Sequence, residues 1–185
     1  MRRRGDEAPR WHSLIMREDC GLNERETITQ ALTQQEITML WTVYLSGEIH
    51  SDWRNKIIQA VEKLDLPIEF TSAVTDHEAS DAAGDHLGEE TEAFWRDHKS
   101  AKVNAIRTRT LIENCDVAVI RFGDKYKQWN ASFDAGYCAA LATPYITLHA
   151  EDILHPLKEV DASALAWATT PEQVVEILKY VVAQV

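Results

Sequence analysis

Short runs of β-branched and aromatic residues alternate along this chain with segments in which apolar residues recur at helical spacing. The five strand-like runs lie at 41–46, 68–73, 116–120, 144–148 and 164–168. Strands that alternate with helices predict an α/β protein whose parallel sheet has helices on both faces. Because crossover connections are right-handed, we expect a flavodoxin-like, doubly wound five-stranded parallel sheet with strand order 2-1-3-4-5.

Helix-start signals mark the segments between these runs. Ser51 or Asp52 is placed to cap the first helix, and Asn130 is placed to cap a helix that runs to Leu141. In the last helix Thr170 is the expected cap, Pro171 the first helical residue, and Gln173 completes a capping box. A further helix is predicted over 93–114.

The chain before the first strand lacks a sustained apolar face. Its apolar residues are scattered and its charges are mixed, so we expect residues 1–39 to form a largely disordered extension. The folded domain is then predicted to span 40–185.

The net charge of the chain limits the classes of molecule that it is expected to bind. The formal net charge is -11, and such an acidic excess repels nucleic acid and anionic membrane surfaces, which leaves small molecules and proteins. No apolar run is long enough to span a bilayer. The three cysteines are odd in number and widely spaced, which indicates a reducing compartment, and we expect a cytoplasmic protein.

Residues 74–92 form a polar segment that we expect to be a long structureless loop. It is rich in groups that can bind metal ions, namely Asp76, His77, Glu78, Asp81, Asp85 and His86. Their spacing matches no recognised metal motif, so no metal site is predicted and a solvated acidic loop is favoured. A lid over a ligand and a metal-assisted hydrolase are the other interpretations.

Ligands of doubly wound sheets bind beyond the carboxyl ends of the strands, where the strand order reverses. Two loops reach that point, one after the first strand and one after the third. The candidate substrate-binding residues on them are Ser46, Gly47, Glu48, His50, Gly123, Asp124, Trp129 and Asn130. Asp134 follows near the start of the next helix, where the helix dipole favours an anion.

Three segments carry a resemblance to a known family: Asp116-Val117-Ala118-Val119-Ile120, Asn130-Ala131-Ser132-Phe133-Asp134-Ala135-Gly136-Tyr137 and Pro144-Tyr145-Ile146. The chain from Trp41 to Tyr180 resembles the YtoQ family of the nucleoside 2-deoxyribosyltransferase superfamily. The resemblance implies that Asp134 occupies the place of the superfamily's nucleophilic glutamate, although its side chain is one methylene shorter. It also implies that Tyr44 orients this nucleophile.

The resemblance implies an enzyme that cleaves the N-glycosidic bond of a nucleoside or nucleotide, by transfer or by hydrolysis, without a cofactor. Its carboxylate would form a covalent glycosyl intermediate, and Glu48, His50 or Asp124 would give a proton to the leaving base. The resemblance further implies a homo-oligomer. The alternative is a non-catalytic nucleotide-binding sensor on the same fold.

Overall fold

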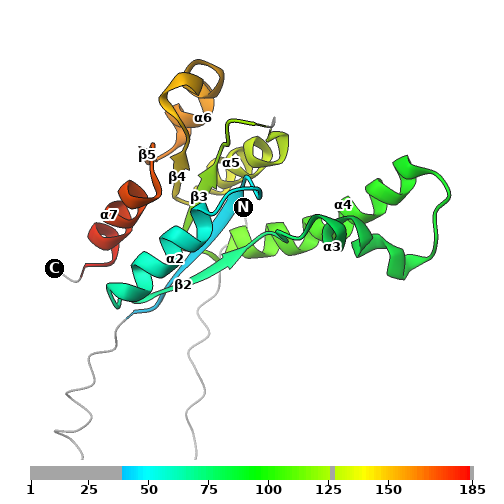
Figure 1. Cartoon of the computed structure of the whole chain (residues 1–185), viewed down its shortest axis with the longest axis horizontal. Helices are drawn as coiled ribbons and strands as arrows, with labels where there is room; N and C mark the ends of the chain where they lie inside the picture. The colour runs from blue at the N-terminus through cyan, green and yellow to red at the C-terminus, as the bar shows by residue number, and fades with distance from the viewer. Residues whose placement is uncertain (1–38, 126–127, 184–185) are drawn as a thin grey trace, which may run out of the picture. The chain divides into compact units, whose positions relative to one another are not determined.

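One five-stranded parallel sheet forms the centre of the fold in the computed structural model, which describes residues 39–125 and 128–183 (Figure 1). The strands are β1 (Trp41–Gly47), β2 (Ile68–Ser72), β3 (Val117–Arg121), β4 (Tyr145–Leu148) and β5 (Ala166–Ala168). Their order is β2-β1-β3-β4-β5, which confirms the predicted flavodoxin-like topology. We predicted disorder for residues 1–39. Of these, residues 1–38 lie outside the described part of the chain.

Helices pack against both faces of this sheet. The helices are α2 (Trp53–Lys63), α3 (His77–Asp81), α4 (Ala93–Asn114), α5 (Trp129–Leu141), α6 (Lys158–Ser163) and α7 (Pro171–Val182). Side chains of α2 and α7 pack on one face, together with Val43 and Leu45 of β1. Side chains of α4, α5 and α6 pack on the other face, which Tyr44 shares. This alternation along β1 follows from the two-residue repeat of a strand.

The predicted structureless loop at 74–92 is wrong in part. It contains α3 and the 3-10 helix η1 (Ala82–Leu87). The Asp76 side chain accepts a hydrogen bond from the backbone of Ala79 at 3.0 Å and so caps α3. Both elements pack against α4 and have few apolar residues, so hydrophobic periodicity gave no signal for them.

The predicted start of α7 is confirmed, whereas the predicted start of α5 is corrected. Thr170 and Gln173 form the expected capping box at the start of α7. Helix α5 begins one residue before Asn130, and Gln128 stands at its N-cap position, so the prediction that Asn130 caps this helix was wrong. Between β4 and α6 lie two 3-10 helices, η2 (Glu151–Ile153) and η3 (His155–Leu157).

Gly47 ends β1 in a conformation that other residues rarely adopt. Its φ is 100°, and a Cβ atom there would lie 2.0 Å from the carbonyl oxygen of Arg121. We expect Gly47→Ala to lower the free energy of unfolding by roughly 2 to 5 kcal/mol, from backbone strain and overpacking. Urea denaturation measures this loss.

Gly136 provides the matched control for that substitution. It lies inside α5, and a Cβ atom there would meet nothing within 4 Å. Gly136→Ala should therefore raise the free energy of unfolding, by up to about 1 kcal/mol. Equal effects of the two substitutions would contradict the role assigned to Gly47.

Candidate active site

The first contact of the site joins β1 to α5. The hydroxyl of Ser46 donates a hydrogen bond to Oδ2 of Asp134 at 2.5 Å. Ser46 lies two residues after Tyr44, so its side chain points to the same face of the sheet. Asp134 lies on the inner side of α5, beside the buried residues Ala131 and Ala135. Strand and helix periodicities thus bring together two polar side chains that are 88 positions apart.

Burial controls the charge of Asp134. The residue is 7% exposed, and Ser46 is 1% exposed. This burial raises the pKa of the Asp134 carboxyl to about 6, and the hydrogen bond from Ser46 opposes the rise. A carboxyl group with this pKa is ionised at neutral pH without a neutralising partner, which is the state that a nucleophile or a general base requires.

Tyr44 lies on the same side of the sheet as Asp134 and is fully buried. Burial and, second, the negative charge of Asp134 raise the pKa of its phenol. Within residues 39–125 and 128–183 the Tyr44 hydroxyl has no partner at hydrogen-bonding geometry. The hydrogen bond to Asp134 therefore comes from Ser46 and not from Tyr44.

Arg54 holds the loop that follows β1. Its buried guanidinium group donates to the carbonyl oxygens of Glu48 at 2.5 Å and Gly47 at 3.1 Å. The indole Nε1 of Trp53 donates to the same Glu48 oxygen at 2.7 Å. Burial lowers the pKa of Arg54 to about 10, an effect that the charges of Glu48 and Tyr44 oppose. Arg54 was not predicted; its one sequence signal is a cation in the first turn of a helix, where the dipole disfavours it.

The Glu48 side chain connects the two loops at the switch point. A Cβ atom on Gly123 would lie 2.4 Å from Cγ of Glu48, so the loop after β3 packs closely on this side chain. The Glu48 carboxylate accepts hydrogen bonds from the backbone of His50 and the hydroxyl of Ser51. Burial works to raise its pKa, yet these hydrogen bonds prevail and the pKa is lowered.

The other predicted site residues lie at the surface of the same edge. Asp124 is exposed, with a carboxylate oxygen 4.0 Å from the guanidinium group of Arg121. Trp129, the first residue of α5, is 71% exposed, and Asn130 and His50 are exposed as well. The amide of Gly123 donates to the side chain of Gln128 at 3.0 Å and so shapes the loop before α5.

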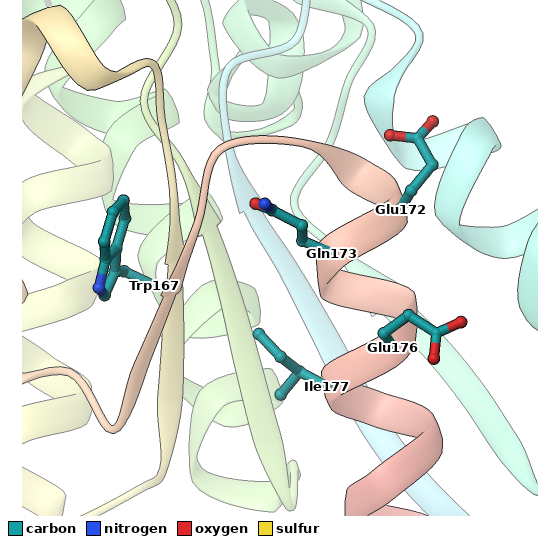
Figure 2. A pocket seen from close by; sticks show the side chains of 5 residues that line it. All are labelled: Trp167, Glu172, Gln173, Glu176 and Ile177. Carbon is teal, nitrogen blue, oxygen red and sulfur yellow. The ribbon is translucent and has the colours of Figure 1, made fainter.

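A shallow hollow of about 430 Å³ lies elsewhere, beside β5 and α7. Figure 2 shows Trp167 on the strand, with Gln173 and Ile177 directed from α7 toward it and Glu176 directed away. None of the predicted site residues lines this hollow. The predicted site is thus separate from it.

Neither a metal-binding cluster nor a membrane-spanning helix occurs in the part of the chain that the structure describes. No three His, Cys, Asp or Glu side chains converge there in a way that could hold a metal ion. Among the acids of the 74–92 segment, Asp85 instead pairs with Arg96 at 2.8 Å, and Asp81 lies 3.3 Å from His77. No described helix has both the length and the apolar character needed to cross a bilayer.

Comparisons with known proteins identify relatives of this chain. The family model of nucleoside 2-deoxyribosyltransferase YtoQ matches residues 44–182, a range that contains Tyr44, Ser46, Glu48 and Asp134. The uncharacterized protein YtoQ of Bacillus subtilis (strain 168) is 38% identical over 143 residues, which cover 77% of this chain and 97% of the relative.

Solved structures give a more distant likeness. A conserved protein from Enterococcus faecalis V583 superposes with a TM-score of 0.53 at 12% identity, over 77% of this chain and 99% of that chain, which is a likeness of fold alone. A 2-deoxyribosyltransferase from Bacillus psychrosaccharolyticus gives 0.44 at 15% identity, over 72% of this chain and 90% of that chain. The family model and the relative in Bacillus subtilis are decisive: this chain belongs to the nucleoside 2-deoxyribosyltransferase YtoQ family.

Proposed function

We propose that this protein cleaves the N-glycosidic bond of a nucleoside or nucleotide, with Asp134 as the nucleophile. The observation that carries the proposal is the buried Ser46–Asp134 pair, which joins the carboxyl end of β1 to α5 within the range that the family model matches. Asp134 is buried, ionised at neutral pH and, among the described residues, in no ion pair, and such a carboxylate is suited to attack an electrophilic carbon.

In the proposed first step an oxygen of Asp134 forms a bond to the anomeric carbon of the sugar. The N-glycosidic bond breaks, its electron pair passes to the base nitrogen, and the base takes up a proton. In the second step the nitrogen of another base, or water, attacks the same carbon, releases the carboxylate and loses a proton. Attack by a base gives transfer and attack by water gives hydrolysis, and neither reaction requires a cofactor.

The remaining residues support this reaction in different ways. The hydroxyl of Ser46 holds one oxygen of Asp134, which leaves the other oxygen for attack. The lowered pKa of Glu48 makes it a poor proton donor and a good acceptor for a sugar hydroxyl. His50 and Asp124, both exposed at the same edge, are the candidates that give the leaving base its proton. Trp129 offers an exposed ring on which a base can stack.

The proposal also covers the partner of the protein, its compartment and its assembly. The partner is a small-molecule nucleoside or nucleotide rather than nucleic acid, because the chain is strongly acidic. Cys115 and Cys138 are free thiols, as in proteins of the cytoplasm. We also propose that identical chains assemble into an oligomer.

The direct test is a panel of deoxyribonucleosides and ribonucleosides, each with and without an acceptor base. Turnover with a sugar adduct on Asp134, seen by mass spectrometry, is the expected result. Asp134→Asn should lower kcat/KM about 1000-fold or more, because a neutral amide is a poor nucleophile. Asp65→Asn, which removes an exposed carboxylate from the end of α2, should leave it unchanged. Binding of a nucleotide without turnover would favour the sensor instead.

The pH profile tests the ionisation of Asp134 separately. Because the carboxyl group must lose its proton, kcat/KM should rise with pH through a value near 6. Ser46→Ala removes the hydrogen bond that lowers this pKa, so the rise should move up by about one pH unit. Ser163→Ala, which removes an exposed hydroxyl on α6, serves as the control. An unmoved profile in Ser46→Ala would count against the mechanism.

The free energy of unfolding should also depend on the ionisation of Asp134, but it should fall, rather than rise, with increasing pH. The carboxyl pKa of Asp134 is raised in the folded chain, so folding favours its protonated form, and stability is lost as pH rises from about 4 through 6. Asp134→Asn should therefore be more stable than the unaltered protein at pH 7, by up to about 2 to 3 kcal/mol, with little difference at pH 4. Urea denaturation across this range measures the difference.

A further inference from the structure

Arg121 is a cation at the carboxyl end of the sheet that the proposed reaction does not use. It is the last residue of β3 and stands in register with Gly47 of β1, while Ile120 stands in register with Ser46. The hydroxyl of Ser46 in turn holds Asp134. Arg121 therefore lies one residue along the strand from the position at which the reaction is proposed to take place.

The guanidinium group of Arg121 is largely removed from water, since the side chain is 16% exposed. Its Nε is buried and has no hydrogen-bond partner within residues 39–125 and 128–183. Its Nη1 lies 3.4 Å from the carbonyl oxygen of Leu148, which already accepts a hydrogen bond from the amide of Phe122 at 2.9 Å. A buried donor without a partner costs free energy, and an acceptor on a bound ligand would offset that cost.

The positive charge of Arg121 also lacks a close partner among the described residues. The carboxylate of Asp124 is 65% exposed and lies 4.0 Å away, so it contributes little. The two buried acids of this edge are engaged elsewhere, because Asp134 accepts from Ser46 and Glu48 accepts from its own loop. The charge of Arg121 is therefore available to an anion that reaches the end of the sheet.

Arg121 and Asp134 belong to opposite faces of the sheet at the same edge. Along β3, Val119 packs with α2 and α7, whereas Ile120 packs with α5, so the two-residue repeat assigns Arg121 to the α2 and α7 side. Asp134 lies on α5, on the other side. A ligand that reaches both residues crosses the end of the sheet between β1 and β3. This is the point at which the strand order reverses and at which open α/β sheets bind ligands.

The chemistry of a guanidinium group indicates the kind of anion. Arginine binds phosphate through parallel N–H···O bonds to two of its charged oxygens, which adds geometric selectivity to the attraction of charge. In a nucleoside 5′-monophosphate, the furanose ring and one exocyclic carbon separate the phosphate from the anomeric carbon. One such molecule can therefore present its phosphate to Arg121 and its anomeric carbon to Asp134, whereas a nucleoside has no anion for Arg121.

We propose that Arg121 binds the 5′-phosphate of the substrate, so that a nucleoside 5′-monophosphate is preferred over the corresponding nucleoside. This role for Arg121 deepens the proposed function and rests on it for the identity of the ligand. With the phosphate held at the end of β3, the anomeric carbon is positioned at the carboxylate of Asp134. Arg121 forms no covalent bond and moves no proton, so the two steps of the reaction stay as described.

Paired substrates test this preference. In the wild-type chain kcat/KM should be about 100-fold higher for a deoxynucleoside 5′-monophosphate than for the same deoxynucleoside, as expected for a charge-assisted pair of hydrogen bonds. Arg121→Gln should abolish most of this ratio, whereas Arg121→Lys, which keeps the charge but not the fork, should retain part of it. Arg96→Gln is the matched control and should leave the ratio unchanged. It removes the same charge from an exposed position on the first half of α4, which extends away from the sheet (Figure 1).

Binding distinguishes a failure of this assignment from a failure of the proposed reaction. Isothermal titration calorimetry on Asp134→Asn, with and without Arg121→Gln, compares the nucleotide, the nucleoside and inorganic phosphate without depending on turnover. The nucleotide should bind more tightly than the nucleoside, and Arg121→Gln should remove the difference.

Equal affinities and equal kcat/KM for the paired compounds would overturn the role of Arg121, while turnover of the nucleoside would still support the reaction. Tight binding of inorganic phosphate, with no gain of the nucleotide over the nucleoside, would show that Arg121 binds a free anion and would also overturn the assignment. Tighter binding of the nucleotide that depends on Arg121, but without turnover in the wild-type chain, would support the phosphate site and contradict the reaction.

Discussion

The hydrogen bond from Ser46 to Asp134 is the interaction on which the site depends. A carboxylate buried without a partner is costly, and this bond is what makes the position of Asp134 tolerable inside the layer between sheet and helix. It also fixes the distance between β1 and α5 at the edge where the strand order reverses. The end of β1 must therefore be rigid, which the close approach of Gly47 to Arg121 and the hydrogen bonds of Arg54 provide.

Two buried carboxyl groups at this edge have opposite properties because their surroundings differ. Glu48 accepts a backbone N–H and a hydroxyl, and these donors lower its pKa in spite of burial. Asp134 accepts one hydroxyl, and burial raises its pKa. Environments that separate the pKa values of two carboxyl groups are typical of sites where one accepts hydrogen bonds and the other reacts. This contrast supports the role proposed for Asp134.

The described chain has two regions that differ in the contacts that stabilise them. The sheet packs with α2 and α7 in one apolar cluster and with α5 in a second cluster on its other face, and this region holds the candidate site. The arm formed by α3, η1 and the first half of α4 is maintained mainly by polar contacts. The family model matches residues 44–182, a range that contains the first region. The arm lies inside the same match.

The sequence by itself determined the five strands, their order, the main helices and the family, because buried parallel strands and amphipathic helices leave strong local patterns. It also predicted that Ser46, Glu48 and Asp134 lie at one edge of the sheet, since strand ends converge there. Only the tertiary structure decided that Ser46 rather than Tyr44 bonds Asp134, that Arg54 holds the loop after β1, and that 77–87 is helical. These features depend on contacts between residues far apart in the chain or on isolated polar bonds, which no local periodicity encodes.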